Sequence, residues 1–170
     1  SKSQSFINKL AQTLAPIGSQ SLLSPHGLLR PYDAEVGEEV LVAGFPYGAL
    51  LSDTIKVTKG IVSARTGLAD DNNNFQIDAA VQSGNSGGPI YDENGNVIGV
   101  VVQRLNKIKM LKVIGSLPEN INFGIKASTI RQFLTSAGLP SKWKHHSQRR
   151  STQDLAKIAK SQTVMVVCHP

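Results

Sequence analysis

Gly84-Asn85-Ser86-Gly87-Gly88-Pro89 is the stretch that decides how this sequence of 170 residues folds and which chemistry it can carry out. A serine attacks a carbonyl carbon well only if its hydroxyl is exposed and oriented, and backbone N–H groups must lie close enough to hold the oxyanion that develops. Glycines on both sides of a serine let the backbone turn so that such N–H groups converge, and they leave room for a substrate main chain. We therefore expect Ser86 to be a nucleophile, with the N–H groups of Gly84 and Ser86 as its oxyanion hole.

Two other interpretations share this pattern of glycine and serine. Gly84, Ser86 and Gly88 also fit the nucleophile elbow of α/β-hydrolases, in which the serine lies between a strand and a helix. Here Pro89 and a predicted β-hairpin follow the serine, so that elbow is disfavoured. The other alternative is a plain loop of glycine, serine and asparagine without a catalytic role, and the surrounding sequence makes it the less favoured interpretation.

Short predicted strands surround the serine stretch. Apolar runs and alternating patterns, separated by turn residues, predict strands at 40–43, 55–64, 75–78, 89–91, 97–102 and 121–125. Asn94-Gly95 predicts a hairpin turn, and Gly60 predicts a bulge or a sharp bend inside its strand. Ser128 is expected to cap a helix over 129–137 that ends at Gly138. Several short strands with turn signals between them indicate an all-β barrel or sandwich, closed by a terminal helix.

The segment from Gln76 to Ile90 resembles the active-serine segment of the HtrA/Deg branch of trypsin-like serine proteases. Four flanking segments resemble further strands and turns of that family, in the same order: 37–48, 57–63, 94–100 and 122–126. The resemblance implies a trypsin-like Greek-key β-barrel with a C-terminal helix. This barrel would be one of the two barrels of the chymotrypsin fold, with the active site in the cleft between them. The resemblance also implies a serine endopeptidase that forms an acyl-enzyme on Ser86.

The same resemblance places substrate-binding residues after the serine, where they would line the specificity pocket and pair with the substrate backbone. The residues expected there are Val102, Gln103, Arg104 and Leu105. The family usually prefers small or medium aliphatic side chains, and Gln103 and Arg104 are more polar than that preference suggests. The alternative for these two residues is a strand end that enters a loop. We expect no cofactor and no metal, because His145-His146 lies in a basic stretch with no further ligand at a useful spacing.

The catalytic base is not recognisable in the sequence. In the family a histidine and an aspartate precede the serine and lie on the first barrel, which needs more residues than the chain has before position 33. His26 is the one histidine before Ser86, and no strand precedes it. Asp78 matches a framework position of the serine-bearing barrel. A serine without its base loses several powers of ten in rate, so we expect this chain to be the C-terminal catalytic half and nearly inactive alone.

The implied partners follow from the resemblance and from the missing base. They are a polypeptide substrate, a first barrel that carries the His–Asp pair on missing sequence or on another chain, and further copies of the chain in a homo-oligomer. The resemblance implies a periplasmic or otherwise extracytoplasmic location. The alternative function is a non-catalytic peptide-binding or scaffold module derived from such a protease.

The sequence divides into three parts. Residues 1–32 are expected to form an N-terminal helix and a connection, 33–139 the serine-bearing barrel with its closing helix, and 140–170 a basic tail with a possible helix and strand. The net charge of +6 is concentrated in the tail. Because no nucleic-acid motif accompanies this charge, we interpret it as a solvated tail rather than a patch for an anionic partner. Cys168 is the only cysteine, so an internal disulfide is excluded, and no apolar run approaches the roughly 20 residues that span a bilayer.

Overall fold

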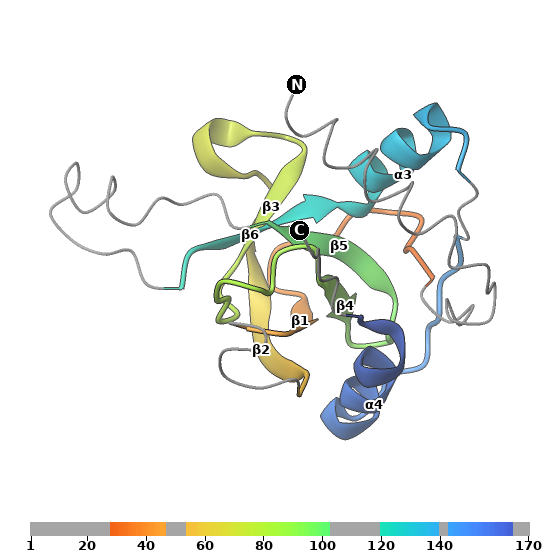
Figure 1. The fold of residues 1–170 in the computed structure, drawn as a ribbon. Coiled ribbons are helices and arrows are strands. Elements are labelled where there is room, and N and C mark those ends of the chain that lie inside the picture. The colour runs from red at the N-terminus through yellow and green to blue at the C-terminus, as the bar shows by residue number, and fades with distance from the viewer. Residues whose placement is uncertain (1–27, 47–53, 103–119, 140–142, 165–170) are drawn as a thin grey trace, which may run out of the picture.

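A computed structural model of the chain describes residues 28–46, 54–102, 120–139 and 143–164. They form a closed antiparallel barrel with the strand order β1-β2-β3-β6-β5-β4 (Figure 1). The strands are β1 (Glu39–Gly44), β2 (Lys56–Ala64), β3 (Asn74–Ile77), β4 (Pro89–Asp92), β5 (Val97–Val102) and β6 (Asn122–Lys126). The helices are the short 3₁₀ helix η2 (Leu68–Asp70), α3 (Ala127–Ser136) and α4 (Thr152–Gln162). This architecture confirms the prediction of an all-β barrel with a helix, α3, after its last strand.

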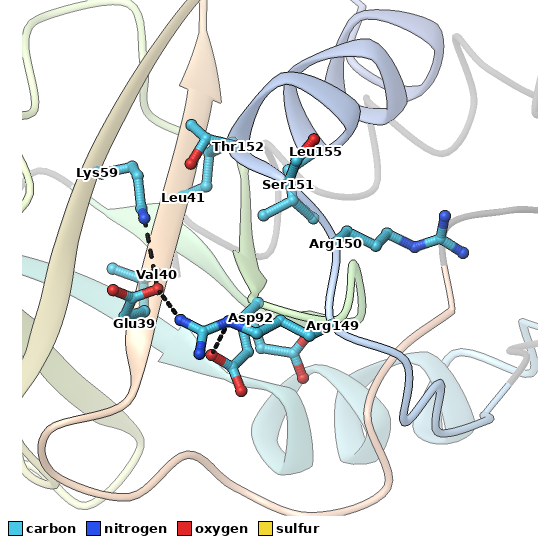
Figure 2. Close-up of a pocket in the computed structure, with 11 residues that line it drawn as sticks. Glu39, Val40, Leu41, Lys59, Asp92, Arg149, Arg150, Ser151, Thr152 and Leu155 are labelled. Carbon is cyan, nitrogen blue, oxygen red and sulfur yellow. Dashed lines mark hydrogen bonds and ion pairs between the residues drawn. The ribbon is translucent and has the colours of Figure 1, made fainter.

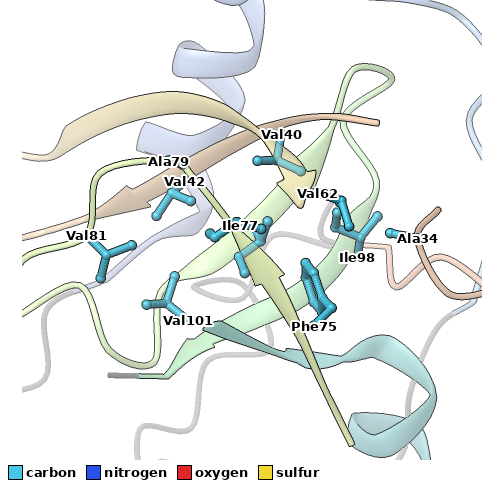
Figure 3. Close-up of a cluster of buried hydrophobic side chains, with 11 residues drawn as sticks. Ala34, Val40, Val42, Val62, Phe75, Ile77, Ala79, Val81, Ile98 and Val101 are labelled. Atoms are coloured by element: carbon cyan, nitrogen blue, oxygen red, sulfur yellow. The ribbon is translucent and has the colours of Figure 1, made fainter. Parts of the chain in front are cut away.

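Alternate strand residues fill the inside of the barrel. Figure 3 shows this inner cluster, to which β1 contributes Val40 and Val42. The other members are Ala34, Val62, Phe75, Ile77, Ala79, Val81, Ile90, Ile98 and Val101. Leu41 and Ala43 belong to a second buried cluster, on the outside of the barrel. Both faces of β1 are therefore covered, and this explains why its sequence is a continuous apolar run rather than an alternating one.

The second cluster lies between the barrel and α4, the helix that packs on β1. Leu155 and Ala159 are four residues apart and thus share one face of the helix. Both are buried, together with residues of β1, β4 and β5: Leu41, Ala43, Tyr91 and Val97. The Ser151 side chain begins the helix by accepting a hydrogen bond from the Asp154 N–H at 3.1 Å. The helix expected within the basic tail of 140–170 is therefore confirmed, and its Lys157 is exposed as expected. The described part of that tail is not wholly solvated, however, because Leu155 and Ala159 contribute to the core.

The Leu155→Ala variant should lose about 2–3 kcal/mol of the free energy of unfolding, since truncating a buried leucine removes burial and leaves a cavity. The matched control is Gln153→Ala, an exposed position on the same helix. That control should stay within about 0.5 kcal/mol of the wild type. Urea unfolding followed by tryptophan fluorescence measures both changes. Equal stabilities of the two variants would contradict the packing of α4 on the barrel.

The chain between the barrel and α4 is held by backbone pairing and by one buried amide. Leu29 forms parallel bridges with Val97 at the start of β5 and with Trp143. The Asn96 side chain is fully buried; it accepts from the His146 N–H at 2.7 Å and donates to the His146 carbonyl at 2.9 Å. The Tyr32 hydroxyl lies 3.0 Å from His145 Nδ1. The neighbouring histidines thus help to attach this segment to the barrel.

Two local expectations need correction. Ser128 does not cap α3, whose N-cap is Lys126; its hydroxyl instead hydrogen-bonds the Asp33 carboxylate at 3.0 Å. Gly60 does not mark the bend in β2, because the register shift against β3 lies between Val62 and Ala64. Gly138, with φ +67°, does follow the end of the helix as predicted.

Candidate active site

The segment that leads from β3 to the serine is pinned to the barrel. The Asp78 side chain accepts a hydrogen bond from the Ile61 N–H at 2.6 Å, and the Asp78 N–H donates to the Ile61 carbonyl at 3.2 Å. A Cβ atom on Gly60 would lie only 2.2 Å from Asp78 Oδ1 and 2.4 Å from the Ala79 nitrogen. Gly60 is therefore needed for this close approach. The Asp78 carboxylate thus holds β2 to the segment after β3. This agrees with its predicted place in the framework of the barrel.

Two consecutive tight turns present the serine. The Asn85 N–H donates to the Gln82 carbonyl at 3.0 Å, and the Gly88 N–H donates to the Asn85 carbonyl at 2.9 Å. The third residue of each turn is a glycine in the left-handed region, with φ +99° at Gly84 and +88° at Gly87. The second residue has no positive φ in either turn, so both follow the type II pattern, which requires glycine at that third position. The glycines of the motif therefore set the backbone path around Ser86.

The second turn is attached to β5 and β1. The Gly87 N–H donates to the Val101 carbonyl, and the Val101 N–H donates to the Gly88 carbonyl, both at 2.9 Å. A Cβ atom on Gly88 would lie 2.2 Å from the Ala43 carbonyl oxygen. The turn thus rests directly on the barrel backbone, and this contact limits how far Ser86 can move.

The remaining polar groups of the turns are available for a ligand. Gly84 and Ser86 are both exposed. Within the described part of the chain, no hydrogen bond occupies the N–H of Gly84, the N–H of Ser86 or the Ser86 hydroxyl. These groups can therefore donate to an oxygen atom outside the fold. No imidazole of the described residues reaches the Ser86 hydroxyl.

The other predicted site residues are only partly placed. Val102 is the last residue of β5, half-buried, directly after the Val101 that holds the serine turn. Gln103, Arg104, Leu105 and His26 lie outside the described residues, as does Cys168. The structure thus brings the start of the expected substrate-binding segment next to the serine turn.

A pocket of about 200 Å³ lies elsewhere on the barrel, between β1 and the start of α4 (Figure 2). Glu39 contacts Lys59 at 3.4 Å and Arg149 at 3.1 Å there, and the hydrogen bond from Lys59 is the main cause that lowers the pKa of Glu39. Arg149 also pairs with Glu93 at 3.1 Å. Exposed ion pairs of this kind contribute little to stability. None of the residues that line the pocket belongs to the serine turns, so we do not regard it as the active site.

Comparisons with known proteins agree with this geometry. The family model of the trypsin-like peptidase domain matches residues 12–100. The uncharacterized protein y4bJ of Sinorhizobium fredii is 39% identical over 136 residues, which are 80% of this chain and 22% of that protein. A probable periplasmic serine endoprotease, DegP-like, of Bartonella henselae is 54% identical over 70 residues, 38% of this chain and 13% of that protein.

Solved structures show the same fold. The crystal structure of Rv3671c from M. tuberculosis in an inactive form matches with a TM-score of 0.53 at 23% identity, over 70% of this chain and 56% of that one. The chain spans less than a quarter of the length of the curated relatives named above. The family model nevertheless covers more than half of the chain and includes Ser86. The chain therefore belongs to the trypsin-like peptidase family and is of the HtrA/Deg type.

Proposed function

We propose that the chain supplies the nucleophile of a serine endopeptidase, with Ser86 forming the acyl-enzyme. The observation that carries this proposal is the exposed serine in two glycine turns, next to N–H groups that bond no described residue. In the reaction a base removes the hydroxyl proton, and Ser86 Oγ attacks the peptide carbonyl carbon. The N–H groups of Gly84 and Ser86 hold the oxyanion. Such electrostatic stabilisation of the transition state usually makes the largest contribution to lowering the activation barrier. The amine then leaves with a proton, and water hydrolyses the ester.

The base must come from outside the described residues. A serine hydroxyl is a weak nucleophile without a positioned histidine, and the loss of triad members lowers the rate by several powers of ten. We propose that a His–Asp pair reaches Ser86 from a first barrel, on further sequence or on another chain. The chain alone is then nearly inactive. The DegP-like relative is named as periplasmic, which supports an extracytoplasmic location.

The substrate would lie along the end of β5. Val102 follows the residue that holds the serine turn, so a peptide that pairs with the chain after Val101 would bring its carbonyl to Ser86. We propose that Val102, Gln103, Arg104 and Leu105 contact this peptide. We propose that the substrate is an extended polypeptide and that contacts with these four residues set the specificity.

A fluorophosphonate probe, which reacts with activated serines, tests the proposal on the gene product that carries this chain. We expect labelling of the wild type and none of Ser86→Ala. The matched control is Ser83→Ala, which removes another exposed hydroxyl from the same pair of turns and should be labelled like the wild type. Peptide mass mapping locates the adduct.

The same experiment separates the enzyme from a peptide-binding module. A folded gene product that is not labelled, or that is labelled equally after Ser86→Ala, contradicts the proposal. The first of these results favours the non-catalytic alternative, which rests on the observation that no base meets the Ser86 hydroxyl among the described residues.

A further inference from the structure

Gly44, the last residue of β1, packs directly against Asn85, the residue before the serine. A Cβ atom on Gly44 would lie 2.9 Å from Asn85 Cα, 3.2 Å from its Cγ and 3.3 Å from its Cβ. The φ angle of Gly44 is outside the left-handed region, so a side chain is excluded there by lack of space and not by backbone conformation. The backbone atom Cα cannot rotate away. Any side chain at position 44 must therefore displace Asn85 itself.

Asn85 is the residue that joins the two turns around the serine. Its N–H closes the first turn on Gln82, and its carbonyl closes the second turn on the Gly88 N–H. It lies between the two N–H groups assigned to the oxyanion hole, those of Gly84 and Ser86. A displacement of Asn85 Cα therefore changes the directions of both N–H groups together.

The Asn85 side chain does not stabilise the fold through hydrogen bonds. It is only 3% exposed, and its Oδ1 atom is buried without a hydrogen-bond partner. Within the described residues the side-chain amide makes no hydrogen bond at all. A buried acceptor without a partner destabilises the folded state. The side chain instead fills the space that the missing Cβ of Gly44 leaves free.

We propose that Gly44 and Asn85 are positioning residues for Ser86. The contact between them sets the path of both turns, and thereby aims the Ser86 N–H and hydroxyl at the substrate carbonyl. This inference rests on the proposed function, because it assigns the contact to the same reaction. Neither residue touches the reacting atoms.

Gly44→Ala tests the contact, and Gly67→Ala is its matched control. A Cβ atom on Gly67 would lie 2.7 Å from Asn74 Cβ, which is comparable crowding on the loop between β2 and β3. We expect Gly44→Ala to slow fluorophosphonate labelling about 100-fold, the cost typical of a small misplacement of reacting groups. Gly67→Ala should label at the wild-type rate. Equal labelling of the two variants would overturn the proposal.

A spectroscopic measurement separates failure of this inference from failure of the proposed function. The amide resonances of Gly84, Ser86 and Gly87 report the turns without any reaction. They should shift in Gly44→Ala and stay in place in Gly67→Ala, even if the wild type is never labelled. Unchanged resonances in Gly44→Ala overturn the positioning role, whereas an unlabelled wild type overturns the proposed function.

Asn85→Ala keeps the proposal testable if Gly44→Ala does not fold. It removes the side-chain amide that packs against Gly44, together with the unpaired Oδ1. The loss of the unpaired acceptor offsets the cavity that is left, so the melting temperature should change little. The labelling rate should fall about 10-fold, because the turns lose the side-chain part of their contact with Gly44. A merely structural asparagine would give the opposite result, a lower melting temperature with unchanged labelling per folded molecule.

Discussion

The Arg30→Met variant is expected to lose about 3–5 kcal/mol of the free energy of unfolding, the cost typical of removing one partner from a buried ion pair. The Arg30 side chain is 4% exposed, and its Nη1 atom lies 2.6 Å from Glu38 Oε2 and 3.3 Å from Asp92 Oδ2. The Asp92 side chain is 2% exposed. Methionine keeps much of the apolar stem but leaves both carboxylates without their cation. Urea unfolding at neutral pH measures the loss.

The pH dependence of that loss identifies its cause. Burial alone would raise the pKa of Glu38, but the hydrogen bond from Arg30, together with the Glu35 N–H and the charge of Arg30, outweighs burial and lowers that pKa below the ordinary 4.5. A depressed pKa in the folded state contributes stability above the unfolded value, and that stability disappears as the pH falls through the folded value. The difference between wild type and Arg30→Met should therefore be widest above pH 4.5 and shrink at lower pH.

Arg65→Met is the matched control for this prediction. Arg65 pairs with Glu35 at 3.1 Å, but the two side chains are 54% and 61% exposed. Solvent screens such a pair, and its loss should cost less than about 1 kcal/mol. A difference for Arg30→Met that equals this control, or that does not change with pH, would contradict the assignment of the cost to the buried ion pair.

The strands and the serine turns could be predicted from the sequence because their signals are local. The hairpin at Asn94-Gly95 forms as expected, with Gly95 at φ +84° between β4 and β5. The glycines at 84 and 87 lie at the positions where type II turns require them. In each case the deciding residues are neighbours along the chain, so the pattern alone fixes the backbone.

Long-range contacts could not be predicted in this way. Arg30 belongs to a stretch that looked like a surface connection, and its carboxylate partners lie on other elements, Glu38 before β1 and Asp92 at the end of β4. Nothing near Arg30 in the sequence indicates burial. The contact between Gly44 and Asn85 likewise joins elements that only the closed barrel brings together.

The packing of the basic segment after the barrel is hidden by its charge. Its net charge suggested a solvated tail, yet Leu155 and Ala159 have the spacing of a buried helix face. Charge describes the exposed face of an amphipathic helix, while the few apolar residues decide where the helix packs. Lys157, which is exposed and pairs with Asp154 at 3.0 Å, lies on that outer face.

The Phe75→Ala variant should lose about 5 kcal/mol of the free energy of unfolding, the upper end of the range for a truncated core aromatic residue. Phe75 is 1% exposed and belongs to the inner cluster (Figure 3). Its ring lies against two glycines on neighbouring strands: a Cβ atom would be 2.6 Å from Phe75 Cε1 at Gly99 and 2.8 Å at Gly124. Because these positions have no side chains, they cannot fill the cavity. Phe133→Ala, a half-buried position on α3, should cost clearly less.

A second substitution shows whether the glycines and the ring form one packing unit. Gly124→Ala alone should destabilise the barrel, since its Cβ would lie 2.5 Å from Ile90 Cδ1 and 2.8 Å from the Phe75 ring. In the Phe75→Ala background the ring is gone, and the side-chain end of Ile90 can turn away, so the added methyl group fills part of the cavity. The double variant should therefore be more stable than the sum of the two single losses predicts, by more than about 0.5 kcal/mol, the margin for independent sites. If the losses of the two single variants simply add in the double variant, the barrel relaxes around the cavity by itself. Gly124 is then not required because of the Phe75 ring.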